Sequence, residues 1–132
     1  QLATLKGHTS NVNNANFSPD GKTIVTASGD NTAKVWDTSG KELATLKGHT
    51  QPLLNANFSH DGKTIVTASW DKTAKVWSSS NQELATLSGH RGGVYDANFS
   101  PDGKTIVTAS EDQTAKVWSS RGQLIATLSG HR

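Results

Sequence analysis

The segment FSPDGKTIVTAS (Phe17–Ser28) occurs three times in this chain of 132 residues. It returns unaltered at Phe99–Ser110, and with one change at Phe58–Ser69, where His60 replaces a proline. Successive copies begin 41 residues apart. A fixed period of this length indicates one supersecondary unit copied in tandem, in which no copy can bury its apolar faces alone.

Each period contains four short segments with strand character. In the first period, strands are predicted at Val12–Phe17, Lys22–Ser28, Thr32–Trp36 and Glu42–Leu46. The turn Ser18–Gly21 separates the first two, because its proline presets φ and its glycine admits a positive φ. Asp30 and Asn31 form a pair that favours a tight hairpin. Helix caps and a 3.6-residue period are absent. The sequence therefore predicts an all-β protein with four antiparallel strands per repeat.

The composition indicates a folded domain and argues against two classes of partner. Hydrophobic residues make up 33% of the chain and charged residues 18%, with 13 basic residues dispersed among 11 acidic ones. Nucleic-acid binding is not expected, since it usually needs a basic stripe or patch. No apolar run approaches the ~20 residues that span a bilayer, and there is no cysteine. The location is left unknown, with a soluble cytoplasmic protein expected if the chain is natural.

The repeated motifs resemble those of the WD-repeat β-propeller family across the whole chain. They comprise the pairs Gly7-His8, Gly48-His49 and Gly89-His90, the SPDG turn, an Asp before each third strand, and a closing Trp. The dipeptide Trp36-Asp37 is intact once, whereas Ser78 and Ser119 replace its aspartate in the other copies. The resemblance implies propeller blades, which we place at 9–48, 49–89 and 90–130, with an extra outer strand at 1–8.

Three repeated polar residues, His8, Ser28 and Asp30, have the residue types of a hydrolase triad. Catalysis is not expected from them, because the set recurs twice and no nucleophile elbow accompanies it. The resemblance instead implies a hydrogen-bond clip in each blade, from the hairpin Asp through the His to a second-strand Ser or Thr and the Trp indole. The three clips are His8, Asp30 and Trp36 with Thr26 or Ser28; His49, Asp71 and Trp77 with Thr67 or Ser69; and His90, Asp112 and Trp118 with Thr108 or Ser110.

No metal or cofactor is expected, since the histidines follow the repeat and lack ligand spacing. A different polar feature lies in the first strand of each repeat, which carries Asn16, Asn57 or Asn98 where the family usually has a small residue. The innermost strand of a blade lies near the propeller channel. We expect these amides to bond to one another, to water or to backbone, because an unpaired buried amide costs about 1–3 kcal/mol; an ion or ligand ring in the channel is the alternative.

Three blades do not close a ring, since propellers typically need 4–8. An open arc would leave an apolar face at each end, so the chain is expected to close by head-to-tail homo-oligomerisation. A nine-bladed trimer is preferred to a six-bladed dimer, in which the inner strands would be crowded. The fourth-strand sequence occurs four times, and we expect Ile125–Leu128 to complete the last blade in preference to Leu2–Leu5.

The copies differ chiefly in three groups of loop residues, two of which the resemblance places on the rim face where family members bind ligands. Candidate partner-binding residues are Asn11, Asn13, Leu54, Trp70, Arg91, Tyr95 and Glu111. Exposed aromatic residues are enriched at binding hot spots. The resulting hypothesis is a non-catalytic scaffold that presents protein or peptide sites. The alternative is an engineered or recently amplified propeller building block with no evolved ligand, which the near identity of the copies favours.

Overall fold

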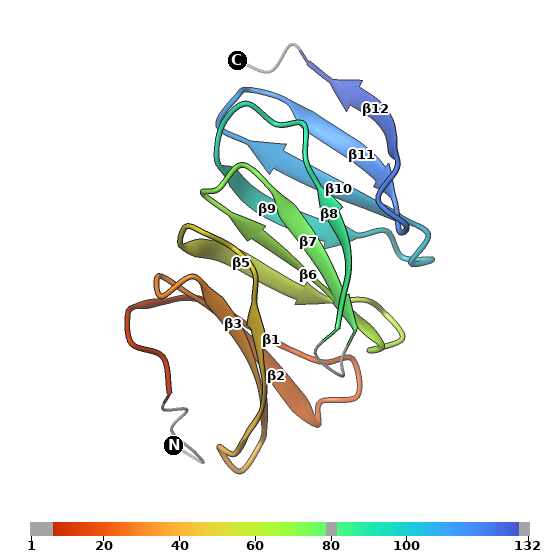
Figure 1. Ribbon diagram of the computed structural model, residues 1–132. Coiled ribbons are helices and arrows are strands. Elements are labelled where there is room, and N and C mark those ends of the chain that lie inside the picture. Colours follow the sequence, from red (N-terminus) through yellow and green to blue (C-terminus); the bar gives the residue numbers. More distant parts are fainter. Residues whose placement is uncertain (1–6, 79–81, 130–132) are drawn as a thin grey trace.

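The computed structural model describes residues 7–78 and 82–129, which form three four-stranded antiparallel sheets stacked as a fan (Figure 1). Each sheet contains four strands that are consecutive in the sequence. The strands are β1 (Val12–Phe17), β2 (Thr23–Ser28), β3 (Thr32–Asp37), β4 (Glu42–Lys47), β5 (Leu53–Phe58), β6 (Thr64–Ser69), β7 (Ala74–Ser78), β8 (Glu83–Leu87), β9 (Val94–Phe99), β10 (Thr105–Ser110), β11 (Ala115–Ser119) and β12 (Leu124–Leu128). The prediction of an all-β chain with four strands per repeat is confirmed.

The β1–β2 turn forms as its residue types dictate. Gly21 has a φ of 72° and its N–H donates to the Ser18 carbonyl at 2.9 Å. Asp20 accepts from the Ser18 hydroxyl at 2.6 Å and from the Lys22 N–H at 2.9 Å, so the turn satisfies its own polar groups. The hairpins from β2 to β3, β6 to β7 and β10 to β11 instead place a non-glycine residue at positive φ. These residues are Asn31, Lys72 and Gln113, with φ of 74°, 75° and 70°.

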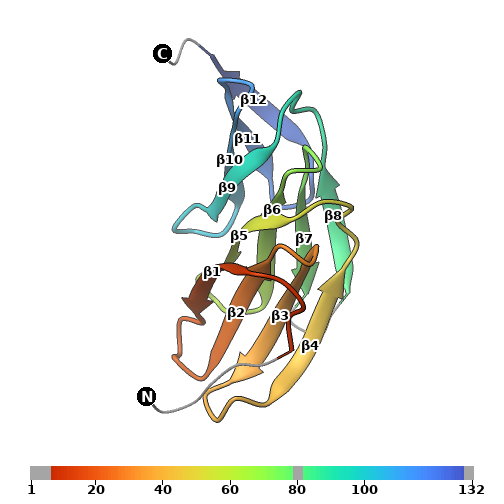
Figure 2. The same ribbon diagram turned by 90° about the vertical axis from the view of Figure 1, so that its left-hand side faces the viewer.

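The core lies between the sheets. Val25, Ala27, Ala33 and the neighbouring apolar residues of the first sheet pack against Leu53, Ala56, Ile65 and Trp77 of the second. The boundary between the second and third sheets repeats this pattern one period later. The inner strands β1, β5 and β9 lie next to one another along the curved stack (Figure 2). The second sheet therefore packs one face on the first sheet and the other face on the third.

The last strand, β12, completes the third sheet by pairing with β11, with Ala115 opposite Leu128. The carboxyl-terminal copy of the fourth strand thus occupies this edge within one chain. The amino-terminal copy Leu2–Leu5, nearly all of the predicted outer strand at 1–8, and the residues 130–132 lie outside the described part of the chain. Within residues 7–78 and 82–129, no helix has the length and hydrophobicity needed to cross a membrane.

Candidate binding face and blade hydrogen-bond clips

The polar residues of each repeat form a hydrogen-bond chain that runs from the surface into the core. In the first sheet, His8 Nδ1 lies 2.9 Å from Asp30 Oδ2, and His8 Nε2 lies 2.6 Å from Thr26 Oγ1. The Trp36 indole N–H donates to the same hydroxyl oxygen at 2.9 Å. One arrangement satisfies all four groups: His8 carries its proton on Nδ1 and donates to Asp30, while the Thr26 hydroxyl donates to Nε2 and accepts from the indole.

The second and third sheets repeat this geometry. The distances are 2.7 Å for His49–Asp71, 2.7 Å for His49–Thr67 and 2.9 Å for Trp77–Thr67, and 2.9 Å for His90–Asp112, 2.7 Å for His90–Thr108 and 2.9 Å for Trp118–Thr108. Of the two hydroxyls that the sequence left open in each clip, the threonine is the one that joins the chain. The serine has another role: Ser28 Oγ accepts from the Asp30 N–H at 3.1 Å and so shapes the hairpin.

The triad-like order of hydroxyl, imidazole and carboxylate in these chains does not present a nucleophile. Thr26 is 2% exposed, and Thr67 and Thr108 are 0% exposed. Each oxygen already accepts from an indole and each hydroxyl proton is directed at a histidine. A nucleophile has to reach a substrate carbonyl, whereas these hydroxyls lie inside the sheet stack. The chains consequently link the outer loop of each sheet to its central strands.

The clip aspartates are held ionised by their partners. Burial raises the pKa of the Asp30 carboxyl, but hydrogen bonds from the Thr32 hydroxyl, the Thr9 N–H and His8 outweigh this and lower it far below its ordinary value. The pKa of Asp71 is lowered in the same way, with His49 and Thr73 opposing burial. Asp112 shows the same balance. A carboxylate that accepts several hydrogen bonds is stabilised in its charged form.

The first-strand asparagines bridge neighbouring sheets. Asn16 Nδ2 donates to the Ala56 carbonyl of the next sheet at 2.8 Å and to Asn14 Oδ1 at 2.8 Å. Asn57 repeats the contact by donating to the Ala97 carbonyl at 2.9 Å. Only the second residue of each pair was predicted from the sequence, and the role of the first was missed. The signal that could have found it is the repeated Asn-x-Asn pattern, which places both side chains on one face of a strand.

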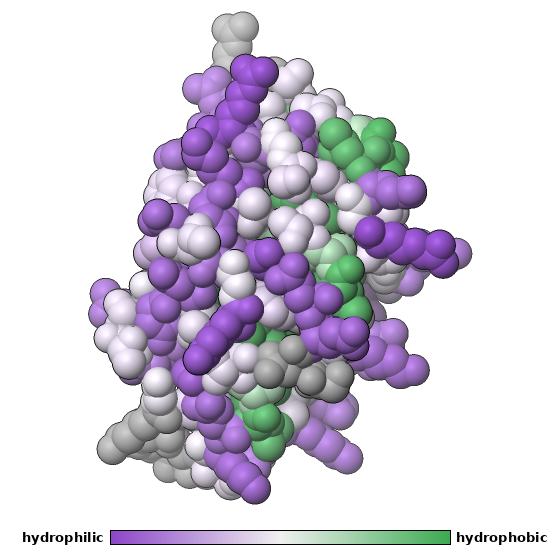
Figure 3. All heavy atoms as spheres, in the orientation of Figure 1, coloured by the Kyte–Doolittle hydropathy of each residue, from purple (hydrophilic) through white to green (hydrophobic). Residues whose placement is uncertain are grey.

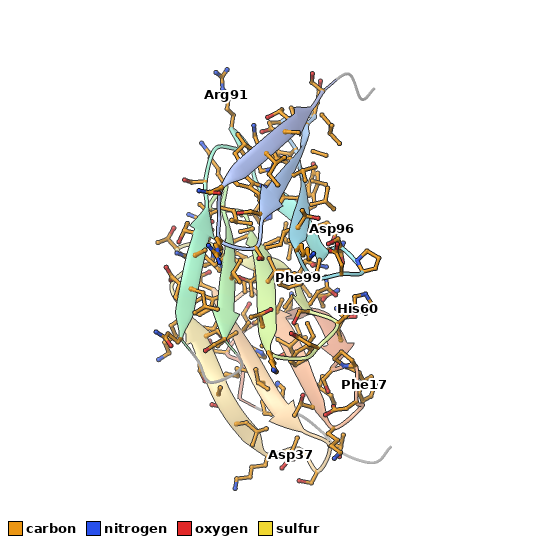
Figure 4. The ribbon with its side chains drawn as sticks, turned by 90° about the vertical axis from the view of Figure 1, so that its right-hand side faces the viewer. Phe17, Asp37, His60, Arg91, Asp96 and Phe99 are labelled. Atoms are coloured by element: carbon orange, nitrogen blue, oxygen red, sulfur yellow. The ribbon has the colours of Figure 1, made fainter. Side chains whose placement is uncertain are left out.

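Asn98 occupies the same position in the third sheet, where the described chain has no following sheet. Its amide donates within its own strand, to Asp96 Oδ1 at 2.9 Å, and its carbonyl accepts from Asn57 at 3.0 Å. Asp96 and Phe99 lie along the same side of the fan as Phe17 and His60 (Figure 4). The three predicted channel-side residues therefore divide into two that contact a following sheet and one at the open end.

Two of the predicted binding residues form an aromatic pair at the boundary of the second and third sheets. Trp70 and Tyr95 have ring centroids 6.1 Å apart and meet edge to face at 76°. Both stay partly open to solvent, at 39% and 47% exposure. The Trp70 ring lies on Gly93, where an added Cβ would be 1.9 Å from Trp70 Cε3. Gly93 is therefore needed for the tryptophan to lie in this position.

The remaining five predicted binding residues lie at strand starts and in loops of the three sheets. Leu54 is in the bulge at the start of β5, one residue after the position that pairs with Ser69, and is half-buried. Glu111 is exposed and lies in the β10–β11 hairpin. The other three predicted residues are also exposed: Arg91 in the β8–β9 loop, Asn11 before β1, and Asn13 within β1. Asn13 donates its amide to the Leu53 carbonyl at 2.7 Å, so it serves the boundary between the first two sheets.

No group of three or more His, Cys, Asp or Glu residues in the described ranges is arranged to hold a metal ion. Comparison with known families accounts for the repeated sequence motifs. The family described as "WD domain, G-beta repeat" matches three times, at residues 1–37, 40–78 and 81–119. The chain belongs to the WD-repeat family. The second and third matches begin just before β4 and β8, the last strands of the first two sheets, so the WD-repeat unit is offset from the four-stranded blade by one strand.

The chain is also similar to a solved WD-repeat structure and to a curated protein. The crystal structure of the RRP9 WD40 repeats superposes with a TM-score of 0.92 at 29% identity, covering 97% of this chain and 41% of that one. Ribosome assembly protein 4 of Saccharomyces cerevisiae is 53% identical over 36 residues, which are 27% of this chain and 7% of that protein. The chain thus spans less than half of either relative, and the sequence match to the curated one covers about one repeat.

Proposed function

We propose that this WD-repeat chain is a non-catalytic β-propeller scaffold that binds a protein or peptide on its rim face, next to Trp70 and Tyr95. The observation that carries the proposal is the half-exposed edge-to-face pair that these two rings form on top of Gly93. Large aromatic side chains with a preset geometry lose little conformational freedom on binding. The proposal rests on this surface, since the match to the ribosome assembly protein is confined to 36 residues.

The contacts of Trp70 indicate where a ligand would lie. Its backbone N–H donates to the Pro52 carbonyl at 3.1 Å, which anchors the main chain, while the ring extends across the boundary to the next blade. Leu54 is the second residue of β5, the inner strand of the same blade, and adds apolar surface. Glu111 and Arg91 supply opposite charges on the third blade. A peptide with one apolar anchor flanked by polar residues matches this arrangement.

The test uses the repeat itself as a control. A peptide library displayed on phage is selected on the immobilised protein, and the selected peptides are titrated against Trp70→Gly, because glycine is the residue at the equivalent position 29. Loss of a hot-spot tryptophan is expected to weaken binding about thirtyfold or more. Leu84→Ser, an exposed apolar residue on an outer strand, is the matched control. Peptides that bind Trp70→Gly as tightly as the wild type would contradict the site, and a library that yields no binder would favour the structural building block without a ligand.

We also propose that the blades close into a ring through copies of the chain. The two ends of the stack expose the counterparts of residues that are buried at the internal boundaries. Val107 is 42% exposed, although the equivalent Val25 and Val66 are 0% exposed. At the other end, Phe17 is 65% exposed, whereas Phe58 packs against the core between the first two blades. The exposed side of the third blade could therefore pack on the exposed side of the first blade of another copy, through the same contacts that join the blades within the chain.

Polar groups support the same closure. Asp96 and Asn98 occupy the positions of Asn14 and Asn16, which bond to the Ala56 N–H and carbonyl in the next blade. In a following copy, the N–H and carbonyl of Ala15 would be the equivalent partners. On the face of the molecule drawn in Figure 3, the apolar surface forms separate patches between polar residues. A head-to-tail contact of this kind closes only at multiples of three blades. A trimer of nine blades leaves the inner asparagines more room than a dimer of six.

Native mass measured by light scattering across a concentration series tests the closure. A sharp trimer, or a dimer, is expected for the wild type, and Val107→Asp is expected to give monomers because it buries an unpaired charge at the contact. Leu84→Asp, which adds the same charge on the outer strand β8, serves as control. A wild-type monomer at every concentration would overturn the proposal and would favour further repeats of a longer chain as the cover of both ends.

A further inference from the structure

The outer strand begins with a glutamate in the first two blades and with a leucine in the third. In the first blade, Lys34 Nζ lies 3.0 Å from Glu42 Oε1 and donates to Thr45 Oγ1 at 2.9 Å, while the Thr45 hydroxyl donates to Glu42 Oε2 at 2.8 Å. The second blade repeats this triangle with Lys75, Glu83 and Thr86, at 3.2, 2.9 and 3.1 Å. In both blades the carboxylate satisfies one ammonium and one hydroxyl.

The third blade retains the lysine and the threonine but lacks the carboxylate. Leu124 stands at the position of Glu42 and Glu83. Lys116 Nζ still donates to Thr127 Oγ1, at 3.0 Å. Within residues 7–78 and 82–129, no carboxylate lies at ion-pair distance from Lys116, and the Thr127 hydroxyl proton has no acceptor. The Lys116 ammonium and the Thr127 hydroxyl are therefore two donors without an anionic acceptor, where the other blades have a carboxylate.

The space that the glutamate occupies in the other blades is open in the third. A Cβ placed on Gly7 would lie 2.8 Å from Glu42 Oε1, and one on Gly48 would lie 3.0 Å from Glu83 Oε1. At the equivalent Gly89, the nearest atoms belong to Trp118, at 3.5 Å, and Lys116, at 4.0 Å. The result is an open hollow of about 240 Å³ lined by Gly89, Arg91, Asp112, Thr114 and Lys116.

The charge around this hollow is reversed relative to the other blades. Arg91 replaces the threonine that stands at positions 9 and 50, and its side chain extends from the β8–β9 loop (Figure 4). The first blade has one cation and two carboxylates at these positions, whereas the third has two cations and one carboxylate. That carboxylate, Asp112, is already engaged by His90, the Arg91 N–H and both donors of Thr114. An incoming anion therefore meets a site with a net positive charge.

We propose that this hollow of the third blade binds a carboxylate of an acidic peptide, in the place that Glu42 and Glu83 fill in the other two blades. Lys116 and Arg91 line the hollow, and Thr127 lies next to it, hydrogen-bonded to Lys116. Lys116 Nζ and the Thr127 hydroxyl donate to the carboxylate, as their counterparts do within the chain. Arg91 attracts a second acidic residue at the mouth of the hollow. This site lies beside the outer strand β12, and Arg91 is the residue that it shares with the proposed rim-face site.

An acetylated and amidated pentaglutamate peptide is the probe, followed by two-dimensional 15N NMR, with pentaglutamine as the neutral control. Saturable shifts are expected at the amides of Lys116, Leu124 and Thr127. Leu124→Glu, which restores the internal carboxylate, and Lys116→Gln are each expected to weaken binding about fivefold, a size typical of partly exposed ion pairs. Arg91→Thr, which restores the residue of the other repeats, is expected to weaken it about threefold. Lys75→Gln removes the same charge from a paired lysine and is expected to change the affinity less than twofold.

Three results would overturn the proposal. The first is equal weakening by Lys75→Gln and Lys116→Gln, which would mean that the peptide responds only to the net charge of the protein. The second is wild-type affinity in Leu124→Glu, which would mean that the place of the glutamate is not the site. The third is displacement of the peptide by inorganic phosphate at lower concentration than by acetate, which would assign the hollow to phosphate. Thermal unfolding of each variant verifies that the blades are intact.

Discussion

The side-chain amide of Asn16 donates to the carbonyl oxygen of Ala56 in the next blade at 2.8 Å, while Asn14 accepts from the N–H of the same Ala56 at 3.2 Å. Ala56 is fully buried. One strand thus pairs both the backbone N–H and the backbone carbonyl of a residue that has no access to water. A buried backbone polar group must find a hydrogen-bond partner. The two asparagines therefore determine both the relative position of neighbouring blades and the stability of their contact.

Asn16→Ala is therefore expected to destabilise the chain by about 1–3 kcal/mol, since it leaves the buried Ala56 carbonyl without its donor. Urea unfolding measures the loss. Asn11→Ala is the control, because Asn11 is exposed and its side chain makes no hydrogen bond within residues 7–78 and 82–129. An equal loss in the two variants would show that the contact between blades contributes nothing beyond the strand itself.

Thr67→Val is expected to cost about 2–4 kcal/mol, because it removes the hydroxyl between the His49 ring and the Trp77 indole at a site with no access to water. The comparison is Thr86→Val, an exposed threonine that contacts Lys75, for which a change below about 0.5 kcal/mol is expected. Thermal unfolding followed by tryptophan fluorescence reports both. Similar midpoints for the two variants would argue against the clip as a stabilising unit.

The clip aspartates make stability depend on pH in the acid range. Their pKa values are lowered in the folded chain, so the unfolded chain takes up protons first as the pH falls. Their stabilisation is present in full above the unfolded value of about 4 and is lost progressively below it. Asp71→Asn is expected to be less stable at pH 7 and to lose less stability than the wild type between pH 5 and pH 2, because one of the carboxyls with a lowered pKa is gone. Urea midpoints across this range provide the measurement, and an unchanged slope would contradict the assignment.

Lys72 holds a left-handed backbone at φ 75°, where the first repeat has Asn31 at φ 74°. Asparagine adopts this region more readily than lysine. Lys72→Asn is therefore expected to stabilise the chain by about 0.5 kcal/mol, and Gln113→Asn by a similar amount. Lys63→Asn, at an exposed position without a positive φ, separates the backbone effect from the loss of charge. Chemical unfolding that shows no gain in either hairpin variant would refute the explanation.

Much of the fold could be predicted because its signals are local and repeated. The turn Ser18–Gly21 and the alternating β-branched strand after it define a hairpin wherever they occur, and the observed strand limits differ from the predicted ones by one residue at most in the first repeat. The choice of Thr26 over Ser28 in the clip could not be made this way. Both hydroxyls are buried on the same strand, and the positions of the His8 ring and the Trp36 indole distinguish them.

By itself, the sequence determined the period, the four strands of each blade and the membership of histidine, aspartate and tryptophan in one repeated set, because these depend on spacing along the chain. The tertiary structure decided which groups meet across blades. It brought Trp70 onto Gly93 and Asn16 onto Ala56, and it left Lys116 beside the space that a glutamate fills elsewhere. These contacts join residues of neighbouring sheets or outer loops. Their distances follow from how the sheets stack, a relation that is set by packing of the apolar faces and has no local signature in the sequence.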